Sequence, residues 1–304
     1  MNILKTVTGT TKLIGELTVL SFRLTLSMLA AAFRCVIPPF KKSLLGETVL
    51  VTGAGHGIGR ELAIKLGGMG CIVICWDINK DRNLDTKNAI VDAGGEAYDF
   101  VVDISNRIEV REAARLMRKY RVPDVTILIN NAAVLMHKSF LDHDVDDVER
   151  TFGVNIFSQF WTVETFLPGM LQNKKGHVVA ICSLCGIYGV TQKVTYCASK
   201  FAVRGLMNGL REEHKSRPFV NFTTVYPFYV ATGLAQDPKY RFSWIFGAIS
   251  PEYAAAEVIE AVQRNYNDYI IPKWLHPLNF ILGILPQSSV DLILNFLSSK
   301  KSQK

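Results

Sequence analysis

The stretch that decides the expected fold is Thr52-Gly53-Ala54-Gly55-His56-Gly57-Ile58-Gly59. It follows a short β-branched run, Thr48–Thr52, and leads into a helical stretch, Arg60–Leu66. Glycines at such a junction let the chain turn tightly and let a diphosphate approach the backbone at the helix N-terminus. Glycine-rich turns also occur by chance, but the position between a strand and a helix favours a dinucleotide site. The residues expected to form it are Gly53, Gly55, Gly57, Ile58 and Gly59.

Working outward from this turn, short apolar runs alternate with amphipathic stretches such as Ile108–Tyr120 and Val145–Leu171. Such alternation predicts a parallel sheet covered by helices on both faces. The expected strands are Thr48–Thr52, Cys71–Trp76, Ala97–Val102, Thr126–Ile129, His177–Cys182, Asn221–Tyr226 and Tyr269–Ile271. The fold class is therefore α/β, a Rossmann-type doubly wound parallel sheet in a single domain, with an N-terminal apolar membrane-associating segment. We divide the chain into that segment (1–44), the Rossmann domain (45–272) and an apolar C-terminal tail (273–304).

The composition adds a preference for membranes over nucleic acid. The 304 residues are 49% hydrophobic with a mean hydropathy of +0.18, and the net charge is +7. No basic run is longer than two residues and aromatic residues do not interleave with the charges, so the sequence does not favour a nucleic-acid partner. Basic residues instead flank the first apolar stretch, with Lys5 and Lys12 before it and Lys41 and Lys42 after it, a pattern that favours anionic lipid head groups.

Residues 17–33 form the most apolar part of the front segment, interrupted by Arg23. A spanning helix needs about 20 apolar residues, and a central arginine is costly there. A cleaved signal peptide is a second interpretation, because Ala30-Ala31-Ala32 resembles a small-residue cleavage site. A helix that lies in one leaflet, or forms a hairpin in it, agrees best with the flanking charges.

The six cysteines have no disulfide-framework spacing, and most lie in apolar runs, which indicates buried thiols in a reducing compartment. Cys182 and Cys185 have CxxC spacing, but no second pair completes a zinc site. We therefore expect no metal.

Polar residues end successive strands, where such folds bind their ligands. Asp77 is placed to accept hydrogen bonds from the ribose hydroxyls of NAD and to repel the extra phosphate of NADP, although Arg60 and Lys80 soften that repulsion. NAD is therefore favoured over NADP. Asp103 is placed to meet the adenine amino group, and the Asn130-Asn131-Ala132 run to line the groove beside the adenosine ribose. The alternative for each is a strand-end or helix-capping residue.

Tyr196 and Lys200 stand four residues apart on an expected helix and therefore share a face. A nearby ammonium stabilises a phenolate, so the pair is suited to accept an alcohol proton. Such pairs are common, but Ser183 lies thirteen residues before Tyr196 at the end of a strand, where its hydroxyl can orient a substrate oxygen. Asn155, expected within a long helix, can hold a water that links Lys200 to solvent. The alternative for Asn155 is a satisfied polar core residue.

With these residues in place, 46–235 resemble the short-chain dehydrogenase/reductase family in its shorter branch. The resemblance is carried by the glycine turn, Asn130-Asn131-Ala132, Asn155, Ser183 and the Tyr196-x-x-x-Lys200 motif. It implies Tyr196 as acid/base, Lys200 bound to the nicotinamide ribose, Ser183 orienting substrate and Asn155 supporting proton relay. It also suggests a homodimer paired through the fifth and sixth helices.

The chain departs from the family pattern at two positions. Ala133 stands where glycine is usual, a change that should be tolerated. Phe228 stands where a glycine usually follows Pro227, which adds an apolar wall close to the nicotinamide. Val230 and Thr232 still match the segment that meets the carboxamide.

Three further runs are similar to one subgroup, the 17-beta-hydroxysteroid dehydrogenases types 11 and 13, the epidermal retinol dehydrogenases and the retinal reductase. The runs are Trp76-Asp77-Ile78-Asn79-Lys80, Gln159-Phe160-Trp161-Thr162 and Phe166-Leu167-Pro168-x-Met170. The resemblance implies a lipophilic alcohol or carbonyl as substrate, and the endoplasmic reticulum membrane or the lipid droplet as location, with the catalytic domain facing the cytosol. The apolar content of 228–249 agrees with a lipophilic substrate, but core packing explains it equally well.

The tail, Trp274–Leu297, is too broken by Pro277, Pro286 and Asp291 to span a bilayer, and is expected at the interface near the substrate mouth. Two other functions compete with an oxidoreductase. One is a lipid-droplet or membrane protein that binds a dinucleotide in a mainly structural role, and the weaker one is a sugar-nucleotide epimerase. The complete set of four catalytic residues favours the enzyme.

Overall fold

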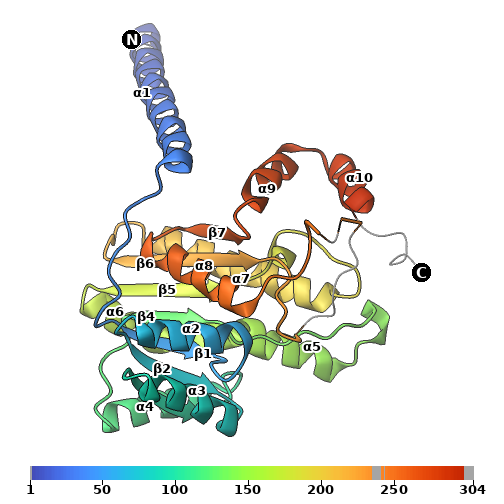
Figure 1. Ribbon diagram of the computed structural model, residues 1–304. Helices are drawn as coiled ribbons and strands as arrows, with labels where there is room; N and C mark the ends of the chain where they lie inside the picture. Colours follow the sequence, from blue (N-terminus) through green and yellow to red (C-terminus); the bar gives the residue numbers. More distant parts are fainter. Residues whose placement is uncertain (1, 235–240, 243, 298–304) are drawn as a thin grey trace. The chain divides into compact units, whose positions relative to one another are not determined.

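A computed structural model describes residues 2–234, 241–242 and 244–297. Seven parallel strands form one sheet in the order β3-β2-β1-β4-β5-β6-β7 (Figure 1). The order reverses between β1 and β4, which is the switch point where doubly wound sheets bind ligands. The strands are β1 (Thr48–Thr52), β2 (Ile72–Asp77), β3 (Glu96–Val101), β4 (Ile127–Asn130), β5 (Gly176–Ile181), β6 (Val220–Pro227) and β7 (Asp268–Ile271).

Helices cover both faces of this sheet. The helices of one face are α2 (Gly57–Gly68), α3 (Lys80–Asp92) and α8 (Pro251–Gln263), and those of the other are α4 (Arg107–Lys119), α6 (Ser158–Gln172) and α7 (Val194–Glu213). The pleat of the central strands explains why these strands are apolar throughout. In β2, Val73 and Cys75 pack against the first set of helices, whereas Ile74 and Trp76 pack against the second.

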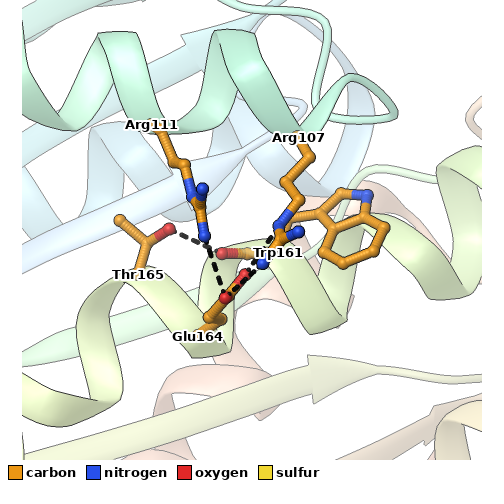
Figure 2. Close-up of polar contacts among 5 residues, drawn as sticks. All are labelled: Arg107, Arg111, Trp161, Glu164 and Thr165. Carbon is orange, nitrogen blue, oxygen red and sulfur yellow. Dashed lines mark hydrogen bonds and ion pairs between the residues drawn. The ribbon is translucent and has the colours of Figure 1, made fainter.

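The two helices α4 and α6 are joined by an ion-pair cluster on their exposed sides (Figure 2). Glu164 accepts two hydrogen bonds from Arg107, at 3.0 and 2.5 Å, and a third from Arg111 at 3.0 Å. The guanidinium of Arg107 also lies 5.1 Å from the ring centre of Trp161. The forked geometry fixes the crossing of two helices on the sheet.

The expected long helix over 145–171 is present as three consecutive pieces. A π-helical turn, Gly153–Phe157, joins α5 (Val145–Phe152) to α6. π turns inside α-helices commonly mark functional sites. This one holds Asn155.

The segment 1–42 forms a compact unit separate from 43–304. It contains α1 (Asn2–Val36), a helix that is continuous through Arg23, without the break that a hairpin needs. Within its described side chains, the stretch Lys12–Ala30 is long and apolar enough to cross a bilayer. The prediction of an N-terminal apolar helix is confirmed.

The tail of the chain forms two helices, α9 (Leu275–Ile284) and α10 (Gln287–Leu297), which Figure 1 draws in red. Arg241 donates a backbone hydrogen bond of 2.9 Å to Leu297, and Phe242 packs on Phe296 with ring centres 6.0 Å apart. The tail therefore packs against the segment that follows β6. Residues 235–240 and 243 of the apolar stretch 228–249 lie outside the described residues.

The α/β fold with a seven-stranded parallel sheet is confirmed, and each expected strand is present. The strand ends differ from the expected ones by one residue at most positions, because the first or last ladder bond depends on the neighbouring strand. The helix after the glycine turn, α2, starts at Gly57, which is three residues before the expected start at Arg60.

Candidate active site

One large cavity of about 1610 Å³ opens at the carboxyl ends of the parallel strands. Its walls come from the glycine turn after β1, the ends of β2, β4, β5 and β6, helix α7, and the tail helices α9 and α10. The cavity therefore extends from the switch point of the sheet to the tail of the chain.

The glycine turn is closely packed in a way that only glycine permits. A β-carbon on Gly59 would lie 2.0 Å from the carbonyl oxygen of Gly53, well inside van der Waals contact. Gly57 has a φ of +56°, and a β-carbon there would lie 2.9 Å from Cγ2 of Thr232. Gly53, Gly57 and Ile58 line the cavity, whereas Gly55 and Gly59 are among the residues behind them. The first N–H groups of α2 thus lie at the cavity, which suits a diphosphate.

Asp77 is held in place at the end of β2. Its Oδ2 accepts a hydrogen bond of 2.9 Å from the N–H of Gly55, and its Oδ1 accepts one of 2.8 Å from Asn79. Each carboxylate oxygen has a second lone pair, and the residue lines the cavity. The structure therefore fixes the carboxylate of Asp77 beside the glycine turn.

Asp103 also lines the cavity, but its Oδ1 caps the turn that follows β3. It accepts hydrogen bonds from the N–H of Ser105 at 2.9 Å and the hydroxyl of Ser105 at 2.6 Å. This is the strand-end role that the sequence left open, because the residue that caps α4 is Asn106. Only the other oxygen remains for a ligand.

The two asparagines at the end of β4, Asn130 and Asn131, have different contacts. Asn130 is directed into the core, where its Oδ1 accepts a hydrogen bond of 2.8 Å from Thr162 on α6, and it does not line the cavity. Asn131 donates from Nδ2 to the carbonyl of Thr52 at 2.9 Å and thereby supports the glycine turn. Asn131 and Ala132 line the cavity.

Ser183, Tyr196 and Lys200 line the cavity together. Ser183 follows β5 in extended backbone, and Tyr196 and Lys200 lie one turn apart on α7, with the ammonium 5.5 Å from the phenol ring centre. Lys200 is 1% exposed, and its Nζ donates a hydrogen bond of 2.9 Å to the carbonyl of Ile181. The three chemical groups that the sequence selected are thus brought to one place.

Burial dominates the acid–base properties of this pair. It raises the pKa of Tyr196 above its ordinary value, while a hydrogen bond with Ser183 acts in the opposite direction. Burial also lowers the pKa of Lys200. The sequence predicted the ammonium beside the phenol but not the desolvation of the phenol, which is the largest cause of its pKa shift.

Asn155 is buried and does not line the cavity. Its Nδ2 donates to the carbonyl of Val134 at 2.9 Å and to the hydroxyl of Ser199 at 3.0 Å, and its Oδ1 accepts from the N–H of Val134 at 2.8 Å. These contacts agree with the alternative of a satisfied polar core residue, and the water that links Lys200 to solvent stays a prediction. The side chain joins the loop after β4 to α7.

Cysteines surround the phenol. Cys185 and Cys197 form a buried cluster with Tyr196, and Cys185 lines the cavity. A hydrogen bond from Cys197 lowers the pKa of the Cys185 thiol, whereas burial raises the pKa of Cys182 to about 11. Sequence spacing alone could not distinguish these two thiols.

The segment after β6 contributes Phe228, Val230 and Thr232 to the cavity wall. Phe228 contacts Phe246 at 6.3 Å between ring centres, and Phe246 contacts Trp274 at 5.3 Å. This aromatic series connects the end of β6 to the start of α9. The expected apolar wall is present.

Several cavity residues were missed by the sequence analysis. They are Ile78, Ile104, Arg150, Val154, Tyr188 and Asn279. Ile78 and Val154 directly neighbour predicted site residues, which was the available signal. No local pattern marks Asn279, since α9 reaches the cavity only through the tertiary fold.

Comparisons with known proteins agree with this geometry. The sequence profile of the short chain dehydrogenase family matches residues 47–240. The chain is 37% identical to short-chain dehydrogenase/reductase family 16C member 6 of Bos taurus, over 86% of this chain and 84% of that protein. It is 36% identical to epidermal retinol dehydrogenase 2 of Mus musculus, over 90% and 89% of the two chains. It is 31% identical to 17-beta-hydroxysteroid dehydrogenase 13 of Homo sapiens, over 93% of each.

Solved structures give the same fold. A short-chain dehydrogenase/reductase from Burkholderia phymatum, in complex with NAD, superposes with a TM-score of 0.72 at 23% identity, over 83% of this chain and 96% of that one. A metagenomic short-chain oxidoreductase in complex with NADP superposes with a TM-score of 0.63 at 27% identity, over 75% and 98%. The predicted family and subgroup are confirmed. The chain belongs to the short-chain dehydrogenase/reductase family and is an oxidoreductase acting on CH–OH groups.

Proposed function

We propose that the protein interconverts a lipophilic alcohol and its carbonyl with NAD(H), using Tyr196 as the acid/base. The observation that supports this most is the single cavity that Ser183, Tyr196 and Lys200 share with the glycine turn and Asp77. Its relatives include a retinol dehydrogenase and a hydroxysteroid dehydrogenase, which supports a retinoid, a hydroxysteroid or another lipid alcohol as substrate.

The cavity residues fit a dinucleotide. The close packing of Gly59 on Gly53 and the N–H groups at the start of α2 suit the diphosphate. The fixed carboxylate of Asp77 suits the adenosine ribose. Gly53, Gly57, Ile58, Asp77, Asp103, Ala132, Val230 and Thr232 would hold it, with Gly55, Gly59 and Asn130 supporting them from behind. When bound, NAD supplies the hydride acceptor and a positive nicotinamide ring. We propose NAD over NADP because Asp77 would repel a ribose phosphate.

The residues of the chain then perform the proton chemistry. The Ser183 hydroxyl holds the substrate oxygen against the phenol, and Tyr196 accepts the alcohol proton during oxidation or donates it during reduction. Lys200 binds the nicotinamide ribose and places a positive charge beside the phenol, which stabilises the phenolate against the effect of burial. We assign Asn155 a positioning role, because its amide fixes α7 through Ser199.

We further propose that the protein acts at a membrane. The apolar helix α1 supports attachment to the endoplasmic reticulum or the lipid droplet, with the catalytic domain in the cytosol. The aromatic wall at Phe228 supports a lipophilic substrate.

The test is reduction of NAD by the purified full chain in detergent or vesicles, with retinol, a hydroxysteroid and a fatty alcohol as substrates. Tyr196→Phe should abolish turnover while NAD still binds, and Tyr188→Phe, which leaves the phenol of Tyr196 intact, should retain measurable turnover. Full activity of Tyr196→Phe would overturn the acid/base assignment. NAD binding by wild type without turnover of any alcohol would favour the structural alternative.

A further inference from the structure

The tail helices add polar side chains to a wall that is otherwise made of leucine. They are Asn279 on α9, and Asp291 and Asn295 on α10. The apolar residues that α9 and α10 place on this wall are Leu275, Leu278, Leu282, Leu294 and Leu297. Asn279 stands among them on α9 and also lines the cavity. The hydroxyl of Tyr188 donates a hydrogen bond of 2.9 Å to its Oδ1.

This hydrogen bond determines what Asn279 offers to a ligand. A primary amide has one acceptor oxygen and two N–H donors. The oxygen accepts the hydrogen bond from the hydroxyl of Tyr188, so the N–H donors are the part of the amide left for a ligand. Within the described part of the chain, Nδ2 of Asn279 has no acceptor. The half-buried pair therefore presents N–H groups, and no charge, to the cavity.

The pair is separate from the reacting groups but linked to them through the backbone. Tyr188 follows the 3-10 helix Leu184–Gly186, which begins directly after Ser183, and its N–H bonds to the carbonyl of Leu184 at 2.9 Å. Asn279 comes from α9, whereas Tyr196 and Lys200 come from α7. A ligand in the cavity thus meets Tyr196 and Lys200 on α7 at one place and the amide of Asn279 on α9 at another.

We propose that the substrate carries a second oxygen, which accepts a hydrogen bond from Nδ2 of Asn279 while its hydroxyl reacts at Ser183 and Tyr196. This inference rests on the proposed function and narrows its substrate class. A rigid apolar alcohol with a ketone or hydroxyl at its other end satisfies both polar positions. A simple fatty alcohol places hydrocarbon against the amide and displaces its water without replacing the hydrogen bond.

The Tyr188–Asn279 hydrogen bond could instead serve only to hold α9 against the loop after Ser183. Its loss would then have a different effect on activity. Loss of that tie would disturb the cavity for every substrate to a similar extent. Loss of a recognition group lowers the rate only for substrates that use it, and mainly through KM. Two matched substrates therefore separate the two roles.

The experiment compares a steroid that has one hydroxyl and no other oxygen with the same skeleton carrying a ketone at the opposite end. Only the hydroxyl can be oxidised in either compound, so the ratio of their kcat/KM values reports recognition of the ketone. We expect the wild type to favour the keto compound about tenfold, the effect of one neutral hydrogen bond. Asn279→Leu should bring the ratio close to one, mainly by raising KM for the keto compound, and Tyr188→Phe should lower it partly. Ser288→Leu, an exposed polar-to-leucine change on α10 outside the cavity lining, is the matched control and should keep the wild-type ratio.

Three results would overturn the inference. The first is a wild-type ratio of kcat/KM values near one. The second is an equal loss of kcat/KM for both steroids in Asn279→Leu. Either of these results leaves the proposed function intact. Failure of the wild type to oxidise any alcohol while NAD binds would overturn the proposed function and this inference together. Calorimetric binding of the two steroids to each variant should give the same ratios as the kinetics.

Discussion

Nδ2 of Asn155 donates a hydrogen bond of 3.0 Å to the hydroxyl of Ser199, which is three residues beyond Tyr196 on α7. The hydroxyl of Ser199 donates a hydrogen bond of 2.7 Å to the backbone carbonyl of Tyr196. Both side chains are fully buried. The π turn that carries Asn155 therefore controls where α7 places the phenol.

Ser199→Ala should destabilise the protein by about 1–3 kcal/mol, because it leaves a buried amide donor without an acceptor. Turnover should fall as well, since α7 loses one of its attachments. Urea unfolding and steady-state kinetics measure the two effects. Ser158→Ala is the control, because that buried hydroxyl bonds only to Val154 in the preceding turn, 2.6 Å away. Equal losses in the two variants would contradict a special role for Ser199.

Asp77→Asn should reduce the preference for NAD over NADP by about tenfold or more, because it removes a negative charge that a ribose phosphate would approach. The dissociation constants of both dinucleotides, measured by calorimetry, give the ratio directly. Asp81→Asn, an exposed change in the first turn of α3, should leave the ratio unchanged. A wild type that already prefers NADP would show that Asp77 does not set the selectivity.

Cys185 should be alkylated by N-ethylmaleimide at a lower pH than an ordinary thiol. A hydrogen bond from Cys197 lowers its pKa, so the thiolate, which is the nucleophile, is present earlier in a rising pH series. Peptide mapping by mass spectrometry follows each cysteine separately. Burial raises the pKa of Cys71 to about 11, that of Cys75 to about 12 and that of Cys182 to about 11. These three thiols should therefore stay unlabelled at pH 8.

Cys197→Ala should shift the labelling of Cys185 to higher pH, because the hydrogen-bond donor is gone. Bound NAD and substrate should slow the reaction, since Cys185 lines the cavity. An unchanged pH profile in Cys197→Ala would refute the contact between the two thiols.

Glu164→Gln should lower the melting temperature at neutral pH. The hydrogen bonds from Arg107 hold the pKa of Glu164 below its ordinary value. Its contribution to stability is therefore complete above that ordinary value and is lost as the pH falls through the lower pKa of the folded state. The difference between wild type and variant should vanish in strong acid and shrink in high salt. Glu112→Gln, which removes a single exposed pair with Arg115, is the control and should change less.

The sequence predicted the sheet because its signal is local. β-branched runs, the glycine turn and the Tyr196–Lys200 spacing each depend on a few neighbouring residues. The contacts of Asn130 and Asn155 could not be predicted, because the direction of an amide depends on helices that are distant in sequence. The raised pKa of Tyr196 likewise follows from burial, which no spacing rule contains.

The tail of the chain gives the clearest example of this limit. The sequence indicated a broken apolar tail near the substrate mouth, but not which of its residues would line the cavity. Asn279 lies 83 positions after Tyr196, and only the path of the chain through β6, α8 and β7 brings them to one cavity.

Because α9 and α10 come at the end of the chain, the residues proposed for the reaction and those of this part of the cavity wall are encoded in different parts of the sequence. The residues proposed to move protons and hold the dinucleotide are encoded before position 235, and the part of the cavity wall that α9 and α10 supply is encoded after 270. Exchange of this last tenth of the gene between relatives would therefore alter which molecule is accepted while the reaction stays the same. In this architecture, a new preference can arise without a change to the catalytic core.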